Sequence, residues 1–450
     1  MALGGKKLSV GKALILNKPN SVFLERAFLC MMAKLWGLFC VWLYMNTKPL
    51  RIKKLLWVVV FLMLFFSCSL FPGRLNVNEG GPVAGSYHSS IPFDYTRDKV
   101  IVPLKIGGAE RRFIFDTGAI TMISQSLYRK MDYPVIGKGS FYDIHQNVDT
   151  ARVVSIPRLQ FGEVVFRDVP AIVYDLNRIP WSCFQVDGII GSNMMRHSAV
   201  QIDLGKKRLT ISDNPDNLDI REAGRAKMKL DKQSSPHIRL KFSENQEDYV
   251  LFDSGSDGFV NLNRSFFERM EDDLPLYMER KGRGSNVMGM IGTGSDDQVW
   301  RFMLDSFSIA GHSFLEPEVE VTQTRSKVGS QLFGYGKVTL DYPSASFYFE
   351  ANKDTLHYRD DNGAGYGFIP VVKNDTFRVG LVWENSLVDS LGLKPGYRIL
   401  RINEYHFADS LESAFCRSFL NDAFKTTPEI EMIYQDEKGD YKRVKIRRKK

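Results

Sequence analysis

One short pattern occurs twice in this sequence and constrains its fold more than any other feature. Each copy is an apolar stretch that runs into an aspartate, then a hydroxyl residue, then glycine: 113–118 and 250–255. The apolar residues are typical of a buried strand, and the glycine allows a tight turn and a close approach of another chain segment. A single copy is no more than an Asx-type turn. Two copies in similar surroundings predict a duplicated unit that ends two strands in carboxylates.

The repeat continues downstream of both aspartates. An apolar pair that ends in glycine follows each copy, at Ile189-Ile190-Gly191 and at Leu332-Phe333-Gly334. A strand-turn-strand pattern then follows each glycine, over 200–211 and 338–349. We therefore expect one architecture used twice, with each unit about the size of a small domain.

These motifs resemble the signature of the aspartic proteases, which is apolar-apolar-Asp-Thr/Ser-Gly with a downstream apolar-apolar-Gly. Two copies in one chain resemble the bilobal pepsin arrangement, while the small units and the Asp-Thr-Gly-Ala form are more similar to the retroviral type. The resemblance covers 97–352. It implies a mostly β, two-lobed acid-protease barrel fold, with one lobe at 97–213 and the other at 227–352.

The resemblance also implies a catalytic pair, Asp116 and Asp253. Two carboxylates held close together share one proton, so that one takes a proton from water while the other donates to the scissile carbonyl. The sequence does not assign the base to either aspartate. No metal or organic cofactor is required. The residues expected to support the two loops follow the aspartates: Thr117, Gly118, Ser254 and Gly255.

A hairpin is expected around 145–147. In the resembled family a hairpin at this point forms a flap over the cleft. Tyr142 is the candidate flap tyrosine, and an ordinary strand tyrosine is the alternative.

The segment 363–450 has a different pattern and resembles a PDZ domain. In such domains a glycine-rich loop captures a peptide carboxylate while the peptide adds a strand. Tyr397 and Glu404 depart from the family pattern, which leaves the fold expected and the peptide affinity open. The residues that match the carboxylate loop are Gly365, Tyr366, Gly367 and Phe368.

The N-terminal region has the layout of a bacterial lipoprotein signal peptide over 45–68. Basic residues precede an uncharged apolar run, 55–66, and Cys68 follows it as the expected lipidation site. A short membrane anchor is the alternative. We expect Met45 to be the true start and 1–44 to be a mis-assigned leader. The segment 69–96 is then a tether, and the enzyme lies outside the cytoplasm as a lipid-anchored protein of the cell envelope.

Cysteine and charge exclude other classes. Only Cys183 and Cys416 lie outside the leader, in different expected domains, so no disulfide framework and no zinc spacing follow. The net charge is +8, but much of the excess lies at the two ends of the chain, so we expect no nucleic-acid partner.

Two functions remain. The first is a membrane-tethered aspartic endopeptidase, expected to be a monomer, that cuts peptide or protein substrates and binds peptide C-termini at the PDZ domain. The second is a non-catalytic, peptide-binding envelope protein that retains the protease fold.

Overall fold

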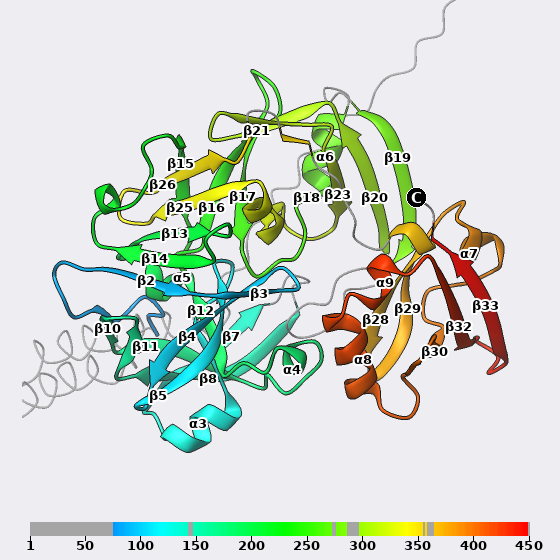
Figure 1. Cartoon of the computed structure of the whole chain (residues 1–450), viewed down its shortest axis with the longest axis horizontal. Helices are drawn as coiled ribbons and strands as arrows, with labels where there is room; N and C mark the ends of the chain where they lie inside the picture. The colour runs from blue at the N-terminus through cyan, green and yellow to red at the C-terminus, as the bar shows by residue number, and fades with distance from the viewer. Residues whose placement is uncertain are drawn as a thin grey trace, which may run out of the picture. The chain divides into compact units, whose positions relative to one another are not determined.

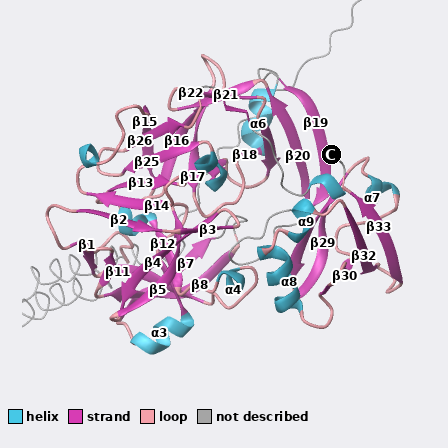
Figure 2. Cartoon of the chain, viewed as in Figure 1, coloured by secondary structure: helices cyan, strands magenta, loops and turns pink. Residues whose placement is uncertain are grey.

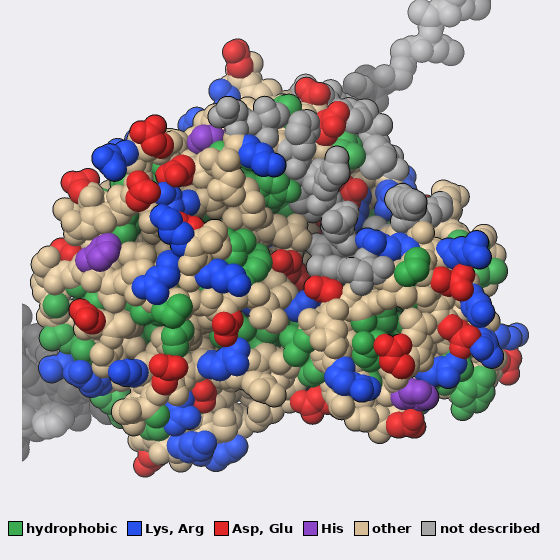
Figure 3. Space-filling view, in the orientation of Figure 1, with side chains coloured by type: hydrophobic (Ala, Val, Ile, Leu, Met, Phe, Trp, Pro, Cys, Tyr) green, Lys and Arg blue, Asp and Glu red, His purple; other side chains and the backbone are tan. Residues whose placement is uncertain are grey.

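The computed structural model describes residues 75–142, 147–271, 276–285, 297–353, 356–357 and 364–448. These residues form a mostly β structure, as expected, with a few short helices (Figures 1 and 2). In the described part, no helix is both long and apolar enough to cross a membrane. Basic and acidic side chains are interspersed over the face seen in Figure 3.

The first lobe is built around β5 (Ala109–Asp116), the strand that ends in the first aspartate. It pairs antiparallel with β4 and parallel with β12. The sheet runs in the order β4 (Lys99–Ile106), β5, β12 (Gly188–Gly191), β6 (Met122–Ser124), β11 (Val169–Tyr174), β8 (Val148–Ile156) and β7 (Val135–Tyr142). At its other edge lie β3 (Asp94–Thr96), β9 (Leu159–Phe161), β10 (Val164–Arg167) and β1 (Gly81–Pro82).

The second lobe repeats this order around β17 (Glu247–Asp253). Each neighbouring pair also has the same sense as in the first lobe, so the structure confirms the expected duplication. The order is β16 (Pro236–Lys241), β17, β24 (Lys327–Gly329), β18 (Val260–Asn263), β23 (Glu318–Thr322), β20 (Asp297–Leu304) and β19 (Leu276–Gly284). At the β16 edge lie β21 (Ser306–Ile309), β22 (His312–Leu315) and β27 (Leu356–His357).

One expected correspondence between the lobes is wrong. Gly191 lies opposite Asp116 in the β12–β5 pair, and the residue opposite Asp253 in the β24–β17 pair is Gly329, not Gly334. Gly334 instead ends the 3-10 helix η3 (Ser330–Gly334). The sequence pattern was misleading because Lys327 replaces the first apolar residue that the motif requires before its glycine.

An antiparallel sheet joins the two lobes. At its centre β13 (Ala199–Asp203) pairs with β25 (Gly336–Asp341). The other strands are β14 (Arg208–Ser212) and β2 (His88–Pro92) on one side, and β26 (Ser346–Ala351) and β15 (Gly224–Leu230) on the other. Since β2 belongs to this sheet, the expectation of a tether is wrong for residues 81–96, whose strands β1, β2 and β3 all pair within the fold.

The alternating side chains of β5 explain why the first aspartate is well anchored. Phe113 and Phe115 point into one buried apolar cluster, while Ile114 points into another on the opposite face. Burial of each such side chain contributes about 1.5–3 kcal/mol. The strand is therefore held on both faces up to the residue that carries the carboxylate.

The C-terminal part, from residue 364 onward, has an apolar cluster of its own. The elements are η4 (Ala364–Tyr366), β28 (Phe368–Lys373), β29 (Thr376–Trp383), α7 (Leu387–Ser390), β30 (Arg398–Ile402), β31 (Tyr405–His406), α8 (Leu411–Leu420), α9 (Ala423–Thr426), β32 (Glu429–Gln435) and β33 (Tyr441–Arg447). The short helices of the lobes are α3 (Gln125–Met131), α4 (Trp181–Phe184), α5 (Ser192–Met195), η1 (Pro215–Asn217) and α6 (Arg264–Met270).

Two connections attach the C-terminal part to the lobes. Strand β29 pairs antiparallel with β19 of the second lobe. On the other side, a disulfide joins Cys183 of α4 to Cys416 of α8, with 5.0 Å between the Cα atoms. The expectation of no disulfide framework is wrong for these two cysteines, because their separation of 233 residues in sequence says nothing about how closely the fold packs α8 against α4.

Candidate active site

The two Asp-hydroxyl-Gly loops meet where the lobes face each other. A Cβ atom at Gly255 would lie 2.2 Å from Oδ2 of Asp116, and one at Gly118 would lie 2.7 Å from Oδ1 of Asp253. No side chain fits at either position, so glycine is required for the close approach. The fold thus brings each predicted catalytic carboxylate against the predicted support glycine of the other lobe.

Backbone donors orient both carboxylates. The N–H of Gly118 donates to Oδ1 of Asp116 at 2.8 Å, and the N–H of Gly255 donates to Oδ1 of Asp253 at 3.1 Å. Each aspartate is therefore fixed by the turn that follows its own strand. The arrangement is the same in the two lobes and follows from the repeated sequence.

The predicted support hydroxyls fix the loops to each other. Thr117 Oγ1 donates to the carbonyl of Phe252 at 2.6 Å, and Ser254 Oγ donates to the carbonyl of Phe115 at 3.0 Å. Both hydroxyl residues are fully buried. Buried hydrogen bonds of this kind are costly to break because the partners have no water to replace them.

Burial raises the pKa of Asp116 to about 7, and the negative charge of Asp253 acts in the same direction. The Gly118 N–H and the Lys99 ammonium oppose these effects. Two carboxylates in such proximity cannot both ionise easily, so the pair retains a proton at neutral pH. The site therefore combines an acid and a base on two adjacent groups.

A second layer of residues was not predicted. Ser192, directly after Gly191, donates from its Oγ to the carbonyl of Thr117 at 2.8 Å and lies 2.8 Å from the hydroxyl of Tyr342. Burial raises the pKa of Tyr342. Gln233 Nε2 donates to the carbonyl of Gly118 at 3.1 Å. Only the position of Ser192 beside the motif glycine offered a sequence signal.

Two buried lysines also lie near the pair, one from each lobe. Lys99 begins β4 and Lys327 begins β24, and the side chains are 7% and 5% exposed. Loss of hydration works against the charged form of Asp257, yet Lys99, Lys327 and Arg97 lower its pKa below the ordinary value. Burial lowers the pKa of Lys327, while Asp253 and Asp257 act against that change.

The other predicted site residues lie elsewhere or outside the described part. Tyr142 is the last residue of β7, and β7 pairs with β8 as the expected hairpin requires. The side chain of Tyr142 is not among the features that the structure describes, and Cys68 lies outside the described residues. In the predicted carboxylate loop, Tyr366 and Phe368 are buried in the C-terminal apolar cluster. Gly367 has a φ of +81°, and its carbonyl accepts the Trp383 N–H at 2.9 Å.

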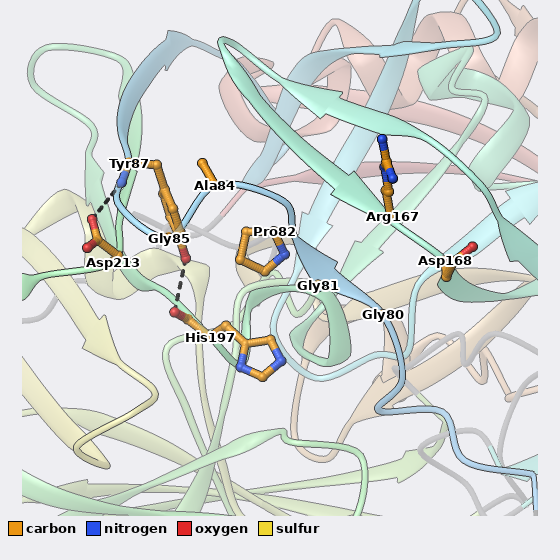
Figure 4. A pocket seen from close by; sticks show the side chains of 10 residues that line it. All are labelled: Gly80, Gly81, Pro82, Ala84, Gly85, Tyr87, Arg167, Asp168, His197 and Asp213. Carbon is orange, nitrogen blue, oxygen red and sulfur yellow. Dashed lines mark hydrogen bonds between the residues drawn. The ribbon is translucent and has the colours of Figure 1, made fainter.

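A cavity of about 460 Å³ lies away from the carboxylate pair, against the strand that enters the first lobe (Figure 4). Asp213 accepts the Tyr87 N–H at 2.8 Å, and the Tyr87 hydroxyl donates to the carbonyl of His197 at 3.0 Å. The residues that line this cavity include neither Asp116 nor Asp253. Asp213, Tyr87 and His197 are already hydrogen-bonded to one another. The cavity is therefore a gap beside β1 and not part of the candidate site.

Comparison with known proteins agrees with this geometry over part of the chain. Residues 102–194 match the model of a family described as Aspartyl protease. That range contains Asp116, Gly191 and most of the first-lobe sheet. No curated protein matches the sequence. Among solved structures, Basic 7S globulin from soybean is similar at 10% identity and a TM-score of 0.34, over 60% of this chain and 96% of that one.

Proposed function

We propose that the chain is an aspartic-type endopeptidase that hydrolyses peptide bonds with Asp116 and Asp253. The observation that carries the proposal is the reciprocal contact of each aspartate with the glycine of the opposite loop. The family match over 102–194 supports a protease-like function for the first lobe. The repeated strand order supports the same role for the second lobe, which supplies the other carboxylate.

The chemistry follows from the shared proton. The ionised carboxylate accepts a proton from a water molecule held between the two groups, and the water oxygen attacks the scissile carbonyl carbon. The protonated carboxylate donates to the carbonyl oxygen, which gives a tetrahedral diol. The carboxyl that took the water proton then passes it to the amine nitrogen as the C–N bond breaks, and the other carboxylate takes back a hydroxyl proton, so the pair again shares one proton. The backbone donors at Gly118 and Gly255 keep the carboxylates in place during this exchange.

The alternative, a peptide-binding protein without activity, is tested by the same residues. The purified full chain in detergent is incubated with a denatured protein mixture, with and without pepstatin, and new termini are read by mass spectrometry. We expect cleavage that Asp116→Asn and Asp253→Asn each abolish. Full activity of Asp253→Asn would instead mean that two first lobes form the site as a dimer. No cleavage by the unaltered protein would favour the alternative.

We also propose that the C-terminal part is a PDZ domain that binds peptide C-termini. Support comes from the glycine-rich turn before β28 and from the separate apolar cluster behind it. The pairing of β29 with β19 places this domain beside the second-lobe strand that corresponds to β7, the expected flap strand of the first lobe. A peptide bound by this domain would therefore lie on the same side of the molecule as β19 of the second lobe.

A location outside the cytoplasm, with a lipid anchor at Cys68, completes the proposal. The basic segment, the apolar run and the Ser67-Cys68 junction are its main support. The Cys183–Cys416 disulfide agrees with it, because disulfides persist chiefly in oxidising compartments.

A further inference from the structure

The two lobes present different side chains to the catalytic centre. In the first lobe, Ile189 lies opposite Ile114, two residues before the pair of Gly191 and Asp116. In the second lobe, Lys327 lies opposite Leu251, two residues before the pair of Gly329 and Asp253. Directly opposite residues of parallel strands share a face of the sheet. Lys327 therefore lies on the face of Asp253, where the first lobe carries Ile189.

The difference extends across the neighbouring strands. In the first lobe the register leads from Ile189 to three further apolar residues, all in one cluster: Met122, Ile172 and Val153. In the second lobe the same steps lead from Lys327 to three polar residues: Asn261, Glu320 and Arg301. The sheet face that carries Ile189 in the first lobe is therefore apolar, and the corresponding face in the second lobe, which carries Lys327, is polar.

Most charges on this second face already have partners. Glu320 accepts from Asn261 Nδ2 at 3.0 Å and pairs with Arg301 at 3.2 Å. Asp257, four residues after Asp253, is stabilised in its charged form by Lys99 and Arg97 as well as by Lys327. Among the described residues, the Lys327 ammonium has no hydrogen-bond acceptor and no carboxylate within 4.0 Å. Asp253 and Asp257 stabilise the charge of this ammonium from a longer distance, and a carboxylate in direct contact is the group that satisfies an ammonium best.

We propose that Lys327 is a specificity-determining residue that binds a carboxylate side chain of the substrate on the second-lobe side of the scissile bond. The inference rests on the proposed endopeptidase function and names its substrate class. The preferred bond has an acidic residue on the side of Lys327, while the first-lobe side carries no charged group at the matching positions, where Ile189 and Ile114 are fully buried. The ammonium donors would then gain a directly bonded carboxylate, which the described part of the chain supplies only at longer range.

The test uses the full chain in detergent and a set of quenched peptides that differ only beside the scissile bond. One flanking residue is Leu throughout, and the other is Glu, Gln, Leu or Lys, with both orders included. We expect kcat/KM to follow Glu, then Gln, then Leu, with Lys the poorest. In Lys327→Met the Glu peptide should lose about tenfold or more, because a site built for a polar group discriminates strongly once the pairing is lost.

Controls separate this role from others. Lys327→Ile introduces the residue that the first lobe has at the corresponding position, Ile189. This variant should cleave the Leu-Leu peptide better than the Glu peptide, and continued cleavage of the Leu-Leu peptide shows that the variant folds. Lys227→Met, on the exposed face of β15, should leave the order unchanged. Equal losses for all peptides, with a shifted pH profile, would make Lys327 only a counter-charge and overturn the proposal. Cleavage without an acidic preference would also overturn it while the protease function stands. No cleavage of any peptide would overturn both.

Discussion

Thr117 and Ser254 exchange hydrogen bonds across the boundary between the lobes. The Thr117 N–H donates to Ser254 Oγ at 2.9 Å, and the Ser254 N–H donates to Thr117 Oγ1 at 3.0 Å. Each hydroxyl also donates onward to the backbone before the opposite aspartate. The two loops are therefore joined by four bonds in which each side chain both accepts and donates. The conformation of each loop therefore depends on hydrogen bonds to the other loop.

Loss of one hydroxyl should loosen both loops. Thr117→Val keeps the shape of the side chain but leaves the Ser254 N–H and the Phe252 carbonyl unpaired in the interior. We expect a loss of about 1–3 kcal/mol in the free energy of unfolding, measured by urea denaturation, together with a lower kcat. Ser313→Ala, at an exposed position on β22, is the control and should change neither. A Thr117→Val protein of normal stability and activity would contradict the role given to this exchange.

The pH dependence should reflect the raised pKa of Asp116, about 7. Above that pH the carboxyl loses its proton, both carboxylates become charged, and no group remains to donate to the scissile carbonyl. We expect kcat/KM to fall about tenfold per pH unit above pH 7. Activity that continues unchanged to pH 9 would contradict this assignment.

Stability should depend on pH through the same group. The pKa of Asp116 rises from an ordinary 3.8 to about 7 on folding, so between these values the native state binds a proton that the unfolded state releases. Stability therefore falls as pH rises through this window and changes no further above it. Asp116→Asn removes the group that titrates. Urea denaturation at several pH values should then show a flatter dependence for the variant than for the unaltered protein.

The two Asp-hydroxyl-Gly loops were predictable because each is local in sequence. An apolar strand, an aspartate, a hydroxyl residue and a glycine specify the strand end and the turn within six positions, and the repeat specifies that the turn occurs twice. Gly329 escaped detection because Lys327 interrupts the apolar pattern that marks its counterpart. A charged residue at this position therefore does not fit a motif that is defined by apolar residues.

Long-range partners were beyond the sequence. Ser192 and Tyr342 are 150 positions apart, and their hydroxyls meet only because β13 and β25 join the lobes. The strands over 81–96 were missed for a similar reason. Polar, glycine-rich sequence is typical of a linker, but here its backbone groups are satisfied by strands already formed elsewhere in the chain.

The Cys183–Cys416 disulfide should stabilise the attachment of α8 to the first lobe. A cross-link over such a long loop contributes about 2–4 kcal/mol, and Phe184 and Phe419 pack edge to face beside it, with ring centroids 5.7 Å apart. The double variant Cys183→Ala, Cys416→Ala should lower the free energy of unfolding by that amount. Non-reducing peptide mapping of the unaltered protein should recover the linked pair. Two free thiols in that protein would show that the bridge does not form.

Cys68 should carry lipid and form the mature N-terminus if the leader is a lipoprotein signal. Cys68→Ala should then prevent labelling by a fatty-acid analogue and leave an unprocessed precursor. Intact mass of the membrane-extracted protein provides the measurement. A mature protein that retains residues before Cys68 would support the alternative of a short membrane anchor.

The C-terminal part should recognise a free carboxylate. Among the described residues β28 pairs only with β29, so its other edge offers backbone groups to an added strand. Pro370 has no N–H, so β28 has one backbone donor fewer than its length allows. Binding should therefore depend strongly on the glycine-rich turn around Gly367, where the chain has a positive φ and backbone donors can converge on an anion.

The measurement uses the full chain with Asp116→Asn, so that peptides are bound but not cut. Fluorescence anisotropy compares labelled peptides with apolar C-terminal residues that differ only in a free or an amidated end. We expect amidation to weaken binding about tenfold or more, since a charged acceptor makes stronger hydrogen bonds than a neutral one. Salt should weaken the free-acid peptide only moderately, because the contacts are to backbone donors and not to exposed side-chain charges. Equal affinity for both peptides would leave this domain a structural role, with β29 and α8 holding the two lobes.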